Sequence, residues 1–98
     1  MLEQELQRQI IKYLKDQGFY SVNVIQAGKR GVPDIIACSP EGVFTAIEVK
    51  APGNLSRVTK LQYYNLAEVR KRGGLAFAAD SLDCVKKVVF SLQKELLN

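Results

Sequence analysis

Three charged residues, Asp34, Glu48 and Lys50, carry the clearest chemical signal in this 98-residue sequence, because each lies near an end of an apolar run. Two carboxylates held close together repel each other unless a positive charge neutralises them. Mg²⁺ can do so, since it binds through one or two carboxylates and completes its shell with water and phosphate oxygens. A lysine alongside can hold or activate a water molecule. These residue types therefore indicate metal-assisted hydrolysis of a phosphodiester.

A predicted hairpin brings the two acids together. Residues 34–39 and 43–50 have the composition of strands, and the Pro-Glu-Gly between them is typical of a turn. A three-residue loop pairs position 39 with position 43, which places Asp34 directly opposite Glu48. Opposed residues point to the same face of a sheet, with Cβ atoms about 4.5–5.5 Å apart. Lys50 shares that face because it lies two residues from Glu48.

A glutamine on a predicted helix is a further candidate for the site. Gln62 interrupts an otherwise apolar helical row that also contains Val58, Leu66 and Val69. A buried amide needs hydrogen-bond partners, and an acidic site can supply them. The alternative is that Gln62 is a buried structural amide.

An N-terminal carboxylate is the last candidate. Glu3 shares a helical row with Gln7, Ile11 and Leu14, whereas Glu5 lies on the opposite, polar row. Helical phase therefore favours Glu3 over Glu5 as the acid that faces the site. As the alternative, Glu3 is a first-turn acid that interacts favourably with the helix dipole.

The composition restricts the chemistry and permits a polyanionic partner. The sequence has no histidine, which excludes serine–histidine triads and histidine-bound zinc. The net charge of +4 permits binding to nucleic acid. Lys29 and Arg30 lie in a glycine-flanked loop before Asp34, and Arg57 and Lys60 lie in the first turn of a predicted helix. These four basic residues are candidates to contact DNA phosphates.

The predicted elements follow the order α-β-β-β-α-β-α. Strands are predicted over residues 19–26, 34–39, 43–50 and 75–79. Helices are predicted over residues 2–17 and over residues 56–72 with Ser56 as N-cap. A last helix runs to about Leu97, with Asp80, Ser81 or Asp83 as its cap. Because the last strand follows a helical crossover, we expect it to pair in parallel within an otherwise antiparallel sheet. We therefore expect residues 1–98 to be a single α/β domain with a four-stranded mixed sheet flanked by helices.

The motifs around the acids resemble a known nuclease family. Gly31-Val32-Pro33-Asp34, followed by Ile47-Glu48-Val49-Lys50, is similar to the PD-(D/E)XK nuclease signature. The first helix, with Ile10-Ile11-Lys12-Tyr13-Leu14, and the later helix with Leu61-Gln62 narrow the resemblance to a stand-alone, phage-type VRR-Nuc domain. It covers roughly residues 3–85 and implies a restriction-endonuclease-like core.

This resemblance implies roles for the metal site. It implies Asp34 and Glu48 as ligands of Mg²⁺ or Mn²⁺, with the carbonyl of Val49 completing the site. Lys50 is then the residue that positions or activates the water, and Gln62 matches the helix glutamine of the family.

The N-terminal helix leaves two matches open. The glutamate of the family falls best on Glu3, whereas Gln7 matches some related junction resolvases by position. The resemblance alone does not decide between them.

The resemblance also implies a substrate and an assembly. Stand-alone members are similar to homodimeric resolvases that cut branched DNA such as four-way (Holliday) junctions. We therefore expect DNA as the substrate, a homodimer, and no small-molecule cofactor beyond the metal. Two alternatives stay open: a catalytically silent nucleic-acid-binding module of the same fold, and a nuclease for linear or flapped DNA.

The sequence predicts a cytoplasmic protein of a bacterium or a phage-infected cell. No apolar run approaches the roughly 18 residues of a membrane span, and the first residues lack the basic and apolar regions of a signal peptide. Cys38 and Cys84 are too few for a disulfide scaffold, so we expect reduced thiols.

Overall fold

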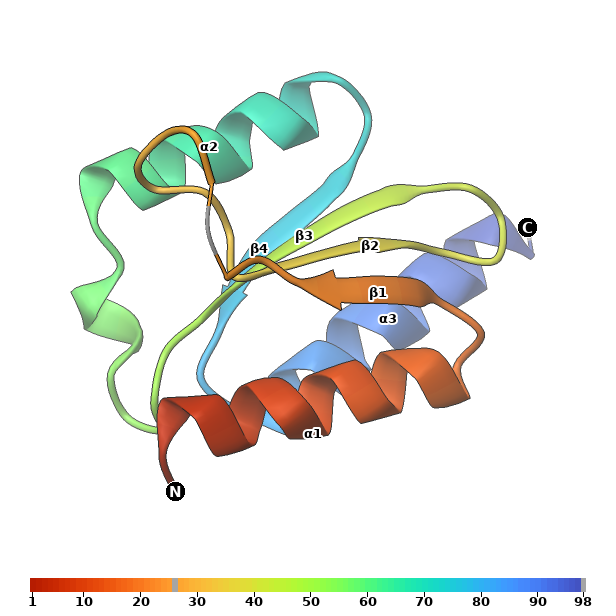
Figure 1. Cartoon of the computed structure of the whole chain (residues 1–98). Helices are drawn as coiled ribbons and strands as arrows, with labels where there is room; N and C mark the ends of the chain where they lie inside the picture. Colours follow the sequence, from red (N-terminus) through yellow and green to blue (C-terminus); the bar gives the residue numbers. More distant parts are fainter. Residues whose placement is uncertain (26, 98) are drawn as a thin grey trace.

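A four-stranded sheet with helices on both faces forms the centre of the computed structural model, which describes residues 1–25 and 27–97 (Figure 1). The helices are α1 (Glu3–Asp16), α2 (Lys60–Lys71) and α3 (Leu82–Leu96), and a 3-10 turn, η1 (Leu55–Arg57), precedes α2. The strands are β1 (Tyr20–Asn23), β2 (Ile35–Cys38), β3 (Phe44–Val49) and β4 (Leu75–Ala79). The predicted α-β-β-β-α-β-α order is confirmed.

The sheet is mixed, as predicted. Its strand order is β1-β2-β3-β4, with antiparallel pairing of β1 with β2 and of β2 with β3. Strand β4 pairs in parallel with β3, because α2 carries the chain back to the end of the sheet where β3 began. None of the helices in the described residues is long and apolar enough to cross a bilayer.

The β2–β3 hairpin has the predicted register. Ile35 pairs with Ile47, and the Ser39 N–H donates to the carbonyl of Val43 at 3.0 Å. Gly42 closes the three-residue loop with a φ of +89°, the left-handed conformation that such loops require at this position. The next pair beyond the ladder joins positions 34 and 48, so their side chains point to one face.

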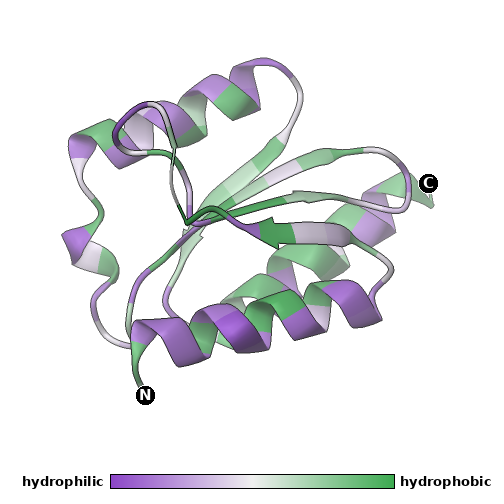
Figure 2. Cartoon of the chain, in the orientation of Figure 1, coloured by the Kyte–Doolittle hydropathy of each residue, from purple (hydrophilic) through white to green (hydrophobic). Residues whose placement is uncertain are grey.

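One face of the sheet packs against α1 and α3. Helix α1 buries Leu6, Ile10 and Leu14 at helical spacing, and α3 contributes Val85 and Val89. Figure 2 shows hydrophilic and hydrophobic residues interspersed along α1, as expected for a helix with one buried side. The strand residues of this core are Ile35, Ala37, Ile47, Val49 and Ala79.

Helix α2 covers part of the opposite face. Leu66 packs against Ala46 and Ala76, whose small side chains allow the helix to lie close to β3 and β4. This close approach brings the start of α2 near the end of β3. The helix does not cover β1, where Tyr20 and Val22 are exposed.

The prediction that Ser56 caps the second long helix was wrong. Ser56 lies in η1, and α2 begins only at Lys60, after Thr59 as N-cap. Thr59 and Gln62 satisfy each other's backbone N–H groups, and Val58 before them is extended. Helix α2 therefore starts after Thr59 rather than after Ser56, because only Thr59 forms a capping box.

The first strand is shorter than predicted. It ends at Asn23 because β2 begins only at Ile35, its last partner, although the Val24 N–H still donates to the Asp34 carbonyl at 2.8 Å. Gln26, the last residue of the predicted strand, lies outside the described residues.

Candidate active site

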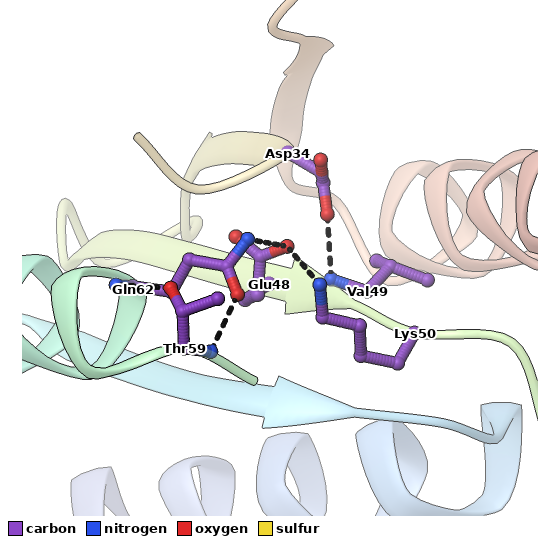
Figure 3. Close-up of polar contacts among 6 residues, drawn as sticks. All are labelled: Asp34, Glu48, Val49, Lys50, Thr59 and Gln62. Atoms are coloured by element: carbon purple, nitrogen blue, oxygen red, sulfur yellow. Dashed lines mark hydrogen bonds and ion pairs between the residues drawn. The ribbon is translucent and has the colours of Figure 1, made fainter. Parts of the chain in front are cut away.

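Asp34 lies one residue before β2, at the point where the β2–β3 ladder opens. Its Oδ2 accepts a hydrogen bond of 2.8 Å from the backbone N–H of Val49, at the end of β3 (Figure 3). Its own carbonyl accepts from Val24, which continues the pairing with β1. The backbone of Asp34 is thus held from one neighbouring strand and its carboxylate from the other.

Glu48 lies on the same sheet face and is almost completely buried, with an exposed fraction of 2%. Its Oε2 is 3.3 Å from Nε2 of Gln62, which donates to it, and 3.7 Å from Nζ of Lys50 (Figure 3). Its Oε1 is buried and has no hydrogen-bond partner, the one such side-chain atom within residues 1–25 and 27–97. Because an unpartnered buried carboxylate oxygen is costly, this atom indicates where a cation can bind.

The electrostatics of the site disfavour a second negative charge. Burial raises the pKa of Glu48 to about 8, and the nearby carboxylate of Asp34 acts in the same direction. The ammonium group of Lys50 lowers this pKa, and the charge of Glu3 raises it. The site therefore holds more negative charge than Lys50 compensates. A divalent cation can neutralise this excess.

Gln62 is held by the first turn of α2. Its backbone N–H donates to Oγ1 of Thr59 at 3.1 Å, and its Oε1 accepts from the Thr59 N–H at 2.9 Å. Since Thr59 occupies the amide oxygen, the amide nitrogen is the end that faces Glu48 (Figure 3). The sequence analysis did not identify Thr59, although Thr-x-x-Gln is itself a signature of a helix start.

Replacing Thr59 should separate this positioning effect from simple loss of a helix cap. We expect Thr59→Ala to lower the free energy of unfolding by about 1 kcal/mol, as for other lost N-caps. It removes the Oγ1 that holds the backbone N–H of Gln62 but keeps the backbone N–H that binds the Gln62 amide oxygen. The loosened first turn should place the amide less well and slow the DNA cleavage that the family resemblance implies. Ser81→Ala is the matched control, since Ser81 caps α3 through Cys84. Urea denaturation and cleavage rates should show both variants destabilised but only the Thr59 variant slower. Equal cleavage by both would contradict this role, and Thr59→Ser should restore the wild-type rate.

Gly31 allows the loop before Asp34 to pack closely against α2. Gly31 has a φ of +75°, and a Cβ added there would lie 2.7 Å from Cγ of Leu61 and 2.8 Å from Nδ2 of Asn65. The same Nδ2 donates to the carbonyls of Arg30 and Leu61, at 3.4 and 3.0 Å. The loop is therefore packed against α2 three residues before the carboxylate that it positions.

Gly31→Ala should lower the free energy of unfolding. A side chain at a positive φ is strained wherever it occurs, and here it also meets α2, so we expect a loss of about 2 kcal/mol or more. Gly73→Ala is the control, because Gly73 has a φ of +86° with open space around it. Both variants carry the strain of a positive φ. The difference between their free energies of unfolding, measured by urea denaturation, therefore reports the steric contact with α2 alone. A smaller loss at Gly31 than at Gly73 would contradict the packing described here.

The four basic residues proposed to contact DNA lie on exposed segments. Lys29 and Arg30 belong to the loop that rests on α2, and Lys60 is the first residue of α2. Arg57, predicted in the first turn of the helix, lies instead in η1. None of the four takes part in an ion pair among the described residues. Figure 1 shows the loop, η1 and the start of α2 on the same side of the sheet.

The donor set is suited to a metal that keeps several waters. In the part of the chain that the structure describes, no three acidic, cysteine or histidine side chains form a cluster that could hold a metal alone. Mg²⁺ needs only one or two carboxylates, with the remaining positions filled by water and substrate oxygens. Asp34, Glu48 with its unpartnered Oε1, and the adjacent backbone of Val49 fit that requirement.

Taken together, the mixed α/β fold and the acid, acid and lysine on one face define a nuclease-type domain. Residues 2–83 match the family model described as "VRR-NUC domain", which covers most of the sequence. The chain belongs to the VRR-NUC domain family.

Two solved structures are similar to the chain. A structure described as a VRR-NUC domain has 27% sequence identity and a TM-score of 0.74, covering 91% of this chain and 95% of its own. A structure described as a VRR-NUC domain protein has 24% identity and a TM-score of 0.72, covering 93% of this chain and 87% of its own. At that identity the second likeness supports the fold alone. The comparison with curated proteins gave no match.

Proposed function

We propose that this chain, as a single VRR-NUC domain over residues 1–98, is a Mg²⁺- or Mn²⁺-dependent DNA endonuclease that cuts branched DNA such as four-way junctions. The observation that carries the proposal is the buried, unpartnered Oε1 of Glu48, on one sheet face with Asp34 and Lys50. A module that only binds DNA has no need to bury a carboxylate at this cost.

Each residue of the site has a distinct task in this proposal. Asp34, Glu48 and the carbonyl of Val49 hold the metal, which when bound supplies charge neutralisation at the phosphodiester and a more acidic water. Lys50 orients that water from the same face. Gln62 fixes the rotamer of Glu48 through its hydrogen bond to Oε2.

The N-terminal acid of the proposed site is Glu3 rather than Gln7. The charge of Glu3 raises the pKa of Glu48, so it acts on the site electrostatically. Gln7 is half-buried, and no hydrogen bond among the described residues joins it to either carboxylate.

The surface around the site suits a polymer better than a small molecule. A hollow of about 490 Å³ lies beside α2, lined by Lys29, Pro33, Phe44 and Tyr64 among others, and neither Asp34 nor Glu48 contributes to it. A small substrate would need the cavity and the reactive groups in the same place. DNA can instead cross the surface, with phosphates bound by the exposed Lys29, Arg30, Arg57 and Lys60.

A cleavage assay tests the proposal. Fluorescently labelled four-way junction, flap and linear duplexes are incubated with the protein and Mg²⁺ or Mn²⁺, alongside Asp34→Ala. We expect metal-dependent cleavage of the junction by the wild type only. Activity that survives in the variant, or binding without cleavage in either metal across a range of pH, would refute the proposed activity. Preferential cleavage of flap or linear DNA would correct the substrate.

We further propose that the enzyme works as a homodimer in the cytoplasm of a bacterium or a phage-infected cell. Cutting both strands of a junction needs two sites, which a two-fold dimer supplies. The free thiols of Cys38 and Cys84 support a reducing compartment. Analytical ultracentrifugation at micromolar concentration should show a dimer, and a monomer alone would refute that state.

A further inference from the structure

Pro33 lies at the position where the β2–β3 ladder would otherwise continue. Ile35 pairs with Ile47, so the same register places Pro33 opposite Val49. Positions 39 and 43 form a hydrogen-bonded pair, with 3.0 Å between the Ser39 nitrogen and the Val43 oxygen. Hydrogen-bonded pairs alternate along an antiparallel ladder. Positions 33 and 49 are therefore a pair of the hydrogen-bonded kind.

The usual exchange of hydrogen bonds does not occur at this pair. The Val49 N–H donates to the side-chain Oδ2 of Asp34, at 2.8 Å. In return, Pro33 can donate nothing to the Val49 carbonyl, because proline has no backbone N–H. The next residue, Lys50, donates its N–H to Ala79 of β4 at 2.9 Å. Since successive residues of a strand direct their backbone groups to opposite neighbours, the Val49 carbonyl points to the side of Pro33 and Asp34.

From this arrangement we propose that Pro33 is a positioning residue of the metal site. By withholding an N–H, it keeps the carbonyl of Val49 available to a divalent cation held by Asp34 and Glu48. A residue with an N–H at this register position has the donor that the ladder needs to continue by one pair. This inference rests on the proposed metal-dependent function. It gives Pro33, which precedes Asp34, a role in the metal site in addition to its role in the loop.

The unmodified protein provides the first test. Backbone carbonyl ¹³C shifts are recorded by NMR during a titration with Mg²⁺, without DNA. We expect the Val49 carbonyl to shift strongly and the Ile47 carbonyl, which is in the ladder, to shift little. If the resonances of Asp34 and Glu48 respond to Mg²⁺ but the Val49 carbonyl does not, the inference fails while the metal site stands. If none of them responds, the proposed function fails as well.

Two variants separate the missing N–H from the rigidity of the proline ring. Pro33→Ala restores an N–H, and a chain assembled by ligation at Cys38 carries lactic acid at position 33, which has neither ring nor N–H. Calorimetry with Mg²⁺ should show affinity reduced about tenfold for Pro33→Ala, in the range of other changes around metal ligands. The lactic acid chain should bind as the wild type does, as should Pro40→Ala, in the exposed hairpin turn.

Each result with these variants decides the inference. Wild-type affinity in a folded Pro33→Ala protein would overturn it. Equal weakening in the lactic acid chain would also overturn it, because the ring rather than the missing N–H would then matter. Circular dichroism verifies the fold. Where Pro33→Ala does not fold, a Val49 carbonyl that ignores Mg²⁺ in the unmodified protein, or weakened Mg²⁺ binding by the lactic acid chain, overturns the inference.

Discussion

Glu48→Gln is expected to abolish DNA cleavage and, at the same time, to stabilise the metal-free protein. Glutamine has nearly the same shape, but it cannot supply a negative oxygen to a cation. Losing about 4 kcal/mol of metal-dependent stabilisation of the transition state corresponds to a rate about a thousandfold lower. The orphaned Oε1 and the proximity of Asp34 show that the ionised side chain is unfavourable in the fold without metal. Removing its charge relieves that penalty.

The gain in stability from Glu48→Gln should appear only without metal. Without metal at pH 8 we expect Glu48→Gln to raise the free energy of unfolding by about 1–3 kcal/mol, which is several degrees in Tm for a domain of this size. With saturating Mg²⁺ the order should reverse, because only the wild type gains binding energy. Thermal melts with EDTA and with Mg²⁺ measure both. Glu41→Gln, in the exposed hairpin turn, is the control and should change neither stability nor cleavage.

Either half of this result can be contradicted separately. A Glu48→Gln protein that still cleaves junction DNA would remove Glu48 from the metal site. An inactive variant that is less stable than the wild type in EDTA would instead show that the glutamate is a structural partner of Gln62 and Lys50. The proposed function requires that Glu48→Gln lose cleavage and gain stability in EDTA.

The sequence allowed the paired acids to be predicted because a hairpin loop fixes a register. Once Pro40–Gly42 is taken as a three-residue loop, Asp34 and Glu48 must oppose each other, since a shift of one residue would reverse every side chain. The same reasoning places Lys50 beside Glu48. These relations depend only on residues within one hairpin, so local rules suffice.

The helical side of the site could be predicted only in part. Helical spacing placed Gln62 on the buried side of its helix, but Ser56 and Thr59 both have side chains that can cap a helix. The choice between them depends on Gln62 completing the box with Thr59 and on Val58 packing into the fold, where it is 8% exposed. Likewise, Glu3 and Gln7 share one helical row, so helical spacing does not choose between them. Contacts between distant elements therefore decided where α2 begins, which local patterns left open.

The stability of the metal-free protein should fall as the pH rises from about 5 to about 8. The pKa of Glu48 in the fold, about 8, is above the value of 4.5 for an unperturbed glutamate. Between these two values the folded protein keeps a proton that the unfolded chain has lost, so the free energy of unfolding decreases with pH. One such group contributes at most about 1.4 kcal/mol per pH unit. Below about 4.5 its contribution is fully present, and above about 8 the loss is complete.

Adding Mg²⁺ should change this pH dependence. Mg²⁺ favours the ionised carboxylate of Glu48, so its binding should release a proton. Its affinity should therefore rise with pH through the same window, by up to about tenfold per pH unit for one proton released. Thermal melts of the wild type in EDTA and in Mg²⁺ should diverge steadily towards pH 8. Glu48→Gln should show no such divergence, because it lacks both the titrating proton and the metal. Parallel wild-type curves with and without Mg²⁺ would mean that the buried carboxylate does not exchange its proton for the cation, which the proposed site requires.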